Sequence, residues 1–135
     1  MMWRSMTVIG CLVGLLSLAW MARPSVSAEN AAKPKSLRHV VCFKFKDTST
    51  KDDVRKIEEA FAQLPKKIDA IKDFEWGTDN SPEGKAQGFT HCFLVTFADE
   101  KGRDAYLPHP AHQDFVKIVG PHVDKVFVID YWTNE

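Results

Sequence analysis

Histidine and tyrosine side chains gather in three short segments of this 135-residue chain. His39 and His91 each stand at the start of an alternating apolar stretch, and Tyr106, His109 and His112 lie within the single segment Tyr-Leu-Pro-His-Pro-Ala-His. Imidazole readily accepts or releases a proton near neutral pH, and a tyrosine hydroxyl can donate a hydrogen bond to a carbonyl oxygen. These residues are therefore the candidates for acid–base chemistry.

His112 is the expected proton acceptor of this set. Pro110 suits the first position of a helix, so His112 is predicted to lie in a first helical turn, where the helix dipole disfavours imidazolium. A neutral histidine is what a general base requires, and Tyr106 would donate its proton to a carbonyl or an enolate. The structural alternative is that Tyr106 covers an apolar layer and His112 is a solvated first-turn residue.

Other chemistries find less support in the sequence. A zinc site built from His39, His91, His109 and His112 would have ligand spacings that match no standard motif, so we expect no metal and no other cofactor. The sequence has no phosphate-binding glycine loop, no nucleophile elbow and no Cys-x-x-Cys pair. The 18 basic residues are balanced by 18 acidic ones, so nucleic acid is not an expected partner.

The candidate residues lie in or beside segments that repeat apolar side chains with strand or helix periodicity. Thr50 and Asp53 form a predicted capping box before a helix that extends to about Leu64, ahead of a bend at Pro65. The expected strands are 37–46, 74–78, 89–97 and 123–132, and the expected helices are 50–64, 99–106 and 110–119.

This order of elements, β-α-β-β-α-β, predicts an α+β fold of the ferredoxin-like kind: a four-stranded antiparallel sheet with its helices on one face. We expect the first and third strands to be central, adjacent and parallel, which would place His39 and His91 at the same end of the sheet. Both histidines alternate in step with the large aromatic residues, so both should point toward the helices. Phe43, Phe93 and Phe61 are expected to line the same pocket as ligand contacts. Alternatively, each histidine is a buried residue bonded to the backbone or to water.

The sheet face opposite the helices is expected to be uncovered and half apolar, with Val40, Cys42 and Leu94 on it. Two such faces packed together predict a homodimer. Cys42 and Cys92 fall on this face, where they are either bonded to each other or two small buried hydrophobic side chains.

The N-terminal region differs from the rest of the chain. A positive charge, an uncharged stretch over 6–22 and the small residues 26–28 predict a signal peptide that is cleaved after Ala28. This predicts a secreted or periplasmic protein with no other contact with the membrane; the alternative is an uncleaved membrane anchor. The expected organisation is a signal peptide at 1–28, a flexible lead-in at 29–36 and one folded domain at 37–135.

Five motifs carry a family resemblance: His39-Val-Val-Cys-Phe-Lys-Phe-Lys46, Trp76-Gly77, Gly88-Phe-Thr-His91, Tyr106–His112 and Val123-Asp-Lys-Val-Phe-Val-Ile-Asp-Tyr131. Together they resemble the stress-responsive A/B barrel domain family, known as Dabb, which implies a dimeric α+β barrel. In plant polyketide cyclases of this family, a motif tyrosine and a motif histidine act as acid and base. The matching positions here are Tyr106 and His112, with His39 and His91 lining the same pocket.

Three functions follow from these observations. The first is an exported, non-catalytic protein that binds a small apolar or carbonyl ligand in a pocket lined by histidine and tyrosine. The second is a cofactor-independent acid–base enzyme, such as a cyclase-like lyase or isomerase. The third is a defence or interaction protein that acts through its dimer surface.

Overall fold

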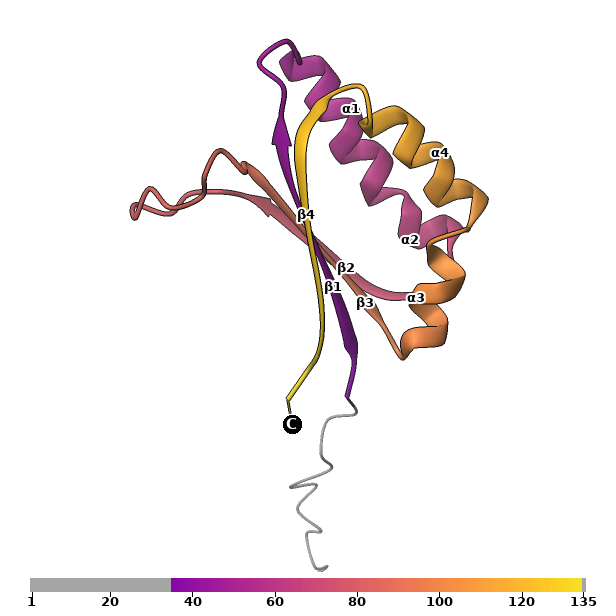
Figure 1. Cartoon of the computed structure of the whole chain (residues 1–135). Coiled ribbons are helices and arrows are strands. Elements are labelled where there is room, and N and C mark those ends of the chain that lie inside the picture. Colours follow the sequence, from indigo (N-terminus) through magenta and orange to yellow (C-terminus); the bar gives the residue numbers. More distant parts are fainter. Residues whose placement is uncertain (1–34, 135) are drawn as a thin grey trace, which may run out of the picture. The chain divides into compact units, whose positions relative to one another are not determined.

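The computed structural model describes residues 35–134, which form one four-stranded sheet with its helices on one face (Figure 1). The predicted signal peptide, 1–28, lies outside these residues. None of the helices within 35–134 is long and apolar enough to span a bilayer. The elements are β1 (Leu37–Phe45), α1 (Lys51–Ala62), α2 (Leu64–Lys67), β2 (Ile71–Thr78), β3 (His91–Phe97), α3 (Glu100–Tyr106), α4 (Pro110–Val119) and β4 (Val123–Trp132).

The sheet order is β2-β3-β1-β4, and all neighbouring strands are antiparallel. This arrangement confirms the predicted ferredoxin-like fold. The expectation that the first and third strands run parallel was wrong. The crossover through α1 makes β1 and β2 parallel, and the hairpin after β2 then reverses the chain, so β3 is antiparallel to β1.

The antiparallel register separates the two strand histidines. His39 pairs with Val95, whereas His91 pairs with Phe43, four positions further along β1. At the usual rise of a strand this offset is about 13 Å. His39 and His91 therefore do not lie at the same end of the sheet, although both point toward the helices, as predicted, and both are buried.

Helix boundaries follow the capping chemistry of the sequence. Thr50 and Asp53 form the predicted capping box at the start of α1, with the Thr50 hydroxyl accepting from the Asp53 backbone N–H. Pro65 ends the regular stripe of α1 and stands near the start of the short α2. The Asp99 carboxylate caps α3, and the His109 side chain caps α4 just before Pro110.

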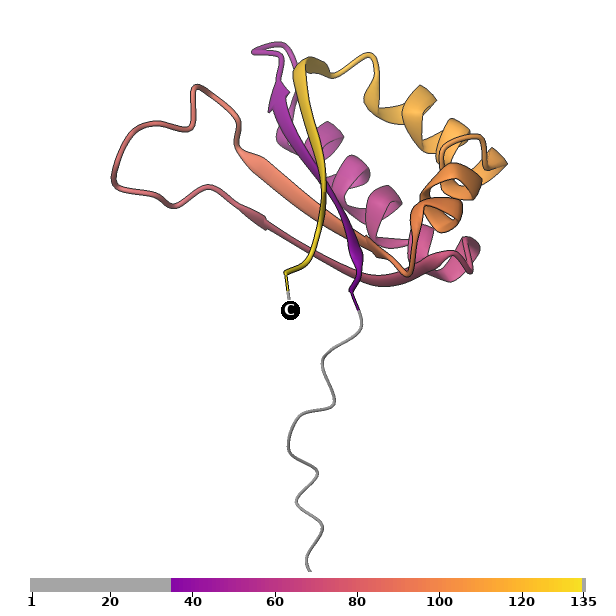
Figure 2. The ribbon, with the colours of Figure 1, turned by 60° about the horizontal axis from the view of Figure 1, so that its bottom comes forward.

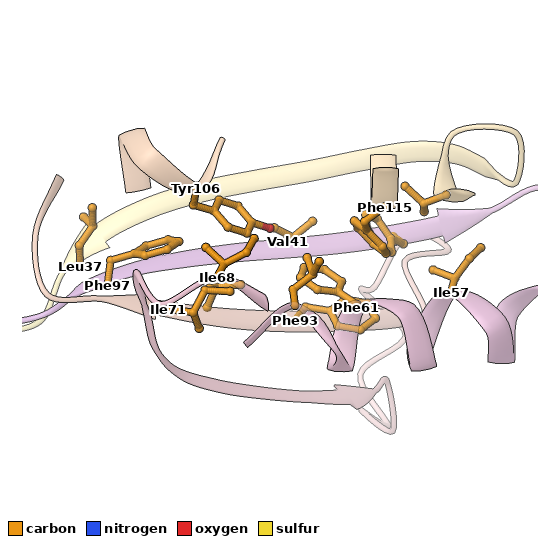
Figure 3. Packing of buried hydrophobic residues seen from close by; sticks show 14 residues of the cluster. Leu37, Val41, Ile57, Phe61, Ile68, Ile71, Phe93, Phe97, Tyr106 and Phe115 are labelled. Carbon is orange, nitrogen blue, oxygen red and sulfur yellow. The ribbon is translucent and has the colours of Figure 1, made fainter. Parts of the chain in front are cut away.

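The core lies between the sheet and the helices and is rich in phenylalanine (Figure 3). Phe61 on α1 is its centre, with ring centroids 4.4 Å from Phe93 and 4.5 Å from Phe115. Phe43 on β1 packs against the same group, 5.3 Å from Phe93. Alternation along β1 and β3 turns every second side chain into this layer, as the sequence pattern predicted.

The other face of the sheet has no layer of described residues over it, and the loop between β2 and β3 extends away from the sheet (Figure 2). Phe127, Ile129 and Tyr131 of β4 pair with Cys42, Val40 and Arg38 and are each roughly half exposed. Cys42 and Cys92 are Cα partners on this face, and neither forms a disulfide.

Candidate functional site

A cavity of about 590 Å³ lies between β1, β4, α3 and α4. The strand register orders its lining, because His39 pairs with Asp130 near one end and Phe43 pairs with Val126 near the other. Tyr106 and His112 join His39 at the polar end. The apolar part of the lining is made by Val41, Phe43, Phe61, Leu107, Phe115, Val116, Val119, Val123, Val126 and Val128. The cavity is thus largely apolar with a few convergent polar groups, as small-molecule sites usually are.

Tyr106, the last residue of α3, contacts both histidines of this cavity. Its ring centroid is 5.8 Å from that of His39 and 4.2 Å from that of His112. The residue is only 1% exposed, and its hydroxyl makes no hydrogen bond to any other side chain or backbone group within 35–134. Burial raises the pKa of Tyr106 well above its ordinary value, so the phenol stays protonated and remains a donor.

His112, in the first turn of α4, is held as a neutral imidazole. Its Nδ1 lies 2.9 Å from the Leu107 carbonyl oxygen, and since a carbonyl can only accept, Nδ1 carries the proton and Nε2 is the unprotonated nitrogen. Burial lowers the pKa of His112, and the nearby His39 and His109 lower it further, against the opposing effect of the Leu107 hydrogen bond. The lowered pKa agrees in direction with the expected neutral His112, but its main cause is burial and not the helix dipole.

His39 has a carboxylate partner that sequence reasoning missed. Its Nδ1 donates to Oδ1 of Asp130 over 2.6 Å, and Oδ2 of Asp130 accepts from Arg103 over 3.1 Å. Asp130 therefore fixes the orientation of the His39 ring from the neighbouring strand, while Arg103 on α3 orients Asp130 in turn. The signal was present in the sequence, since antiparallel pairing of the first and last strands places His39 opposite Asp130.

His91 does not join this cluster, which corrects the prediction that it lines the same pocket. Its Nε2 lies 2.9 Å from Glu58 and its Nδ1 lies 2.9 Å from the Thr90 hydroxyl, and the Trp76 ring stacks on it. It borders a different cavity, of about 630 Å³, beside the β2–β3 loop. The reason is the antiparallel direction of β3. His91 is a buried histidine with satisfied partners, but these are side chains and not the backbone or water that the alternative expected.

The three phenylalanines assigned to the pocket are divided in the same way. Phe43 and Phe61 line the 590 Å³ cavity, whereas Phe93 lies beneath them and is completely buried in the core. Within 35–134 no three His, Cys, Asp or Glu side chains are grouped in a way that could hold a metal ion. His109 instead uses Nδ1 to accept from the Ala111 backbone N–H.

The fold and the cavity together define the general class of protein: a ferredoxin-like α+β domain with a tyrosine and two histidines in one apolar cavity. The chain belongs to the stress responsive A/B barrel domain family, whose model matches residues 37–133. It is 38% identical to the stress-response A/B barrel domain-containing protein HS1 of Arabidopsis thaliana, over 70% of this chain and 87% of that protein. It is 31% identical to olivetolic acid cyclase of Cannabis sativa, over 71% of this chain and 95% of the cyclase.

Solved structures show the same relationship. The hydroxynitrile lyase of Passiflora edulis is similar with a TM-score of 0.71 and 28% identity, over 76% of this chain and 97% of the lyase. A dimeric ferredoxin-like protein of Thermobifida fusca matches with a TM-score of 0.64 and 25% identity, over 75% of this chain and 93% of that one. Proteins that share this fold therefore include enzymes and a dimer.

Proposed function

We propose that the chain is a cofactor-independent acid–base enzyme that removes a proton from carbon beside the carbonyl group of a small, uncharged substrate. The observation that carries the proposal is the convergence of His112, Tyr106 and the His39–Asp130 pair at one end of an apolar cavity. Both imidazole rings contact the Tyr106 ring, so their centroids lie within about 10 Å of each other and one small substrate can contact both.

In the first step, His112 acts as the base. Nε2 of His112 takes the proton from the carbon beside the carbonyl, and the electron pair of that C–H bond moves toward the carbonyl oxygen to give an enolate. Its Nδ1 keeps its own proton on the Leu107 carbonyl throughout, so the ring stays in one tautomer. The lowered pKa of His112 means that this base is unprotonated at neutral pH.

The second step concerns the negative charge that develops on oxygen. The Tyr106 hydroxyl has no hydrogen-bond acceptor among the described residues, so it is available to donate to that oxygen. Its raised pKa keeps the proton on the phenol. A donor that is already in place inside an apolar cavity stabilises the enolate more than water would.

His39 is assigned a supporting role at the same end. Because Asp130 accepts from its Nδ1, the Nε2 nitrogen of His39 is the atom left to contact the substrate. The proton that Nε2 of His112 has taken returns from that same nitrogen to the product, so His39 contributes contact and orientation. Asp130 and Arg103 are positioning residues, since they act through His39.

The lining also selects a class of substrate. Arg103 is paired with Asp130 at 3.1 Å and with Asp104 at 3.2 Å, so its charge is already balanced and offers little to an anion. The remaining lining toward Phe43 and Val126 is apolar. The expected substrate is therefore an uncharged ketone or aldehyde with an alkyl or aryl tail.

Two relatives support this chemistry. One is named as a cyclase and the other as a hydroxynitrile lyase, and a hydroxynitrile is a carbonyl compound to which hydrogen cyanide has added. The lyase name therefore describes a reaction that involves a carbonyl carbon, and the cyclase name describes the closing of a ring. In this chain the shared fold carries the histidine and tyrosine side chains that such reactions need.

The test is proton exchange at carbon. The chain is incubated in deuterated buffer with acetophenone, benzoylacetone and methyl ketones of graded alkyl length, and loss of the proton signal beside the carbonyl is followed by NMR. We expect exchange above the buffer rate that rises with tail length. His112→Gln should reduce it by at least about a hundredfold, and Tyr106→Phe should also reduce it.

His91→Gln is the matched control, because His91 is also a buried histidine paired with a carboxylate but lies outside the cavity. It should leave the exchange rate unchanged. If no ketone exchanges faster than in buffer, while the same ketones shift the resonances of Phe43 and Val126, the chain binds ligand without turnover. That result would favour the non-catalytic binding function, which the apolar lining also supports.

A further inference from the structure

The two free cysteines on the uncovered sheet face carry an inference that does not depend on the proposed enzyme. We propose that Cys42 and Cys92 are a redox modification site, where a reversible disulfide bonds β1 to β3. Both side chains lie on the face opposite the candidate active site, and the bond would join the two central strands of the sheet.

The geometry comes from the strand register. Cys42 and Cys92 are direct Cα partners in the antiparallel pairing of β1 and β3. Directly opposed residues in such a pair have Cα atoms about 4.5–5.5 Å apart, within the range that a disulfide spans. Opposed residues also project their side chains to the same face. The pairing therefore places the two Cα atoms at a separation that a disulfide can span.

The two thiols are open to a small oxidant. Cys92 is exposed and Cys42 is half-buried, and both line the 630 Å³ cavity beside the β2–β3 loop. Burial, together with the neighbouring Cys92, raises the pKa of Cys42 to about 11. The more exposed Cys92 is accordingly the thiol that reacts first.

The reaction is thiol–disulfide exchange with a small disulfide such as oxidised glutathione. The Cys92 thiolate attacks one sulfur of that disulfide, which forms a mixed disulfide and releases one small thiol. Cys42 then loses its proton and attacks the Cys92 sulfur, which forms the Cys42–Cys92 bond and releases the second small thiol. The protein loses two electrons and two protons, and the small disulfide is reduced to two thiols.

The bond would act on stability and on assembly. It closes a loop of about 50 residues that contains α1, α2 and β2, so it restricts the unfolded chain. The bond also uses up the exposed Cys92 thiol. A free Cys92 thiol on this face, which carries several exposed apolar residues, could otherwise cross-link two chains. We therefore expect the disulfide to form in the single chain, before another chain covers that sheet face.

The experiment uses the full chain with Cys11→Ser, which leaves the two sheet thiols as the protein's cysteines. The folded protein is incubated with oxidised glutathione at about pH 8.5, near the ordinary pKa of a thiol. A second sample also carries Ile129→Lys, so that association through this face cannot hide the thiols. We expect loss of both thiols, a mass lower by two hydrogen atoms and a cross-linked Cys42–Cys92 peptide pair.

Three comparisons make the result specific. The oxidised protein should melt at least about 5 °C above the reduced one, and dithiothreitol should reverse the difference. Cys42→Ser should stop at the mixed disulfide on Cys92. The double variant with serine at both positions should show no redox effect on melting.

The proposal fails if both thiols remain free in the folded Ile129→Lys sample after exposure to oxidised glutathione. It also fails if the product is a disulfide between two chains, or if the bond forms only in urea. None of these results touches ketone exchange, so the two proposals are tested separately.

Discussion

The lowered pKa of His112 has a direct consequence for the pH dependence of the proposed reaction. A general base works in its unprotonated form, so the rate should fall on acidification with a midpoint below the ordinary histidine value of 6.5. Proton exchange of a ketone followed from about pH 4.5 to 8 would show this limb. NMR titration of the His112 ring would give the same midpoint. A midpoint above 6.5 would contradict the assignment of His112 as a partly buried base.

The same shift links His112 to stability. The unfolded chain binds a proton at the ordinary pKa, whereas the folded chain resists protonation until lower pH, so the unfolded state carries more protons in between. The contribution of His112 to the free energy of unfolding is present above pH 6.5. It is lost as the pH falls through the lower pKa that His112 has in the folded chain. Urea unfolding should therefore show a smaller loss of stability on acidification for His112→Gln than for the parent chain.

Asp130 offers a test of positioning at the level of one residue. Asp130→Asn keeps the size of the side chain but weakens the charged hydrogen bond to His39, so exchange should slow by about tenfold or more while ketone binding stays near normal. Asp124→Asn is the control, since Asp124 lies on the same strand and pairs with Lys44 outside the cavity. Equal effects of both variants would show that Asp130 is merely structural.

At the scale of elements, the caps set where the helices begin. Thr50→Ala removes the side-chain acceptor for the Asp53 N–H and should cost about 1 kcal/mol of unfolding free energy. Thr48→Ala, in the exposed turn just before the helix, should cost almost nothing. Chemical denaturation of both variants measures the difference, and equal losses would mean that the capping box contributes little.

Periodicity and capping were sufficient to locate the elements. The alternation of β1 and β3 and the stops at Pro65 and Gly120 placed nearly every boundary within two residues. β2 was the exception, because it begins at Ile71, three residues before the expected start at Phe74. Ile68 and Ile71 are both buried, so helix spacing and strand burial give the same apolar signal over so short a stretch.

The candidate site depended on strand direction, which periodicity does not contain. A strand shows the same alternation whichever way it runs, so His91 was grouped with His39 until the pairing of β3 placed it opposite Phe43. Tyr106 and His112 were found because their motif is local in sequence and spans the α3–α4 break. Asp130 was missed because its contact with His39 joins residues far apart in the chain and needs a register as well as a direction.

At the scale of the whole molecule, the N-terminal region gives a prediction about processing. We propose that the chain is exported and that its first residue after cleavage is Glu29, because a positive start, an uncharged stretch and Val-Ser-Ala precede that residue. Mass spectrometry of the protein from its native host would show a mass that lacks 1–28. An intact Met1 in the membrane fraction would show an uncleaved anchor instead.

The uncovered sheet face gives the prediction about assembly. Phe127, Ile129 and Tyr131 form an apolar row on β4, and their partners on β1 include Val40 and Cys42. Contiguous exposed apolar surface of this kind usually marks an interface, and the neighbour from Thermobifida fusca is described as dimeric. We therefore expect a homodimer in which two such faces pack together.

Ile129→Lys tests this arrangement, because a charge at the centre of an apolar interface is buried without a partner. Light scattering at micromolar concentration should report twice the chain mass for the parent protein and the mass of one chain for the variant. Ile118→Lys is the matched control, since Ile118 is 46% exposed and Ile129 is 48% exposed, but Ile118 lies on α4, on the helical side of the sheet. It should leave the mass doubled. If the parent chain is monomeric, or if Ile118→Lys alone separates the chains, the sheet face is not the interface.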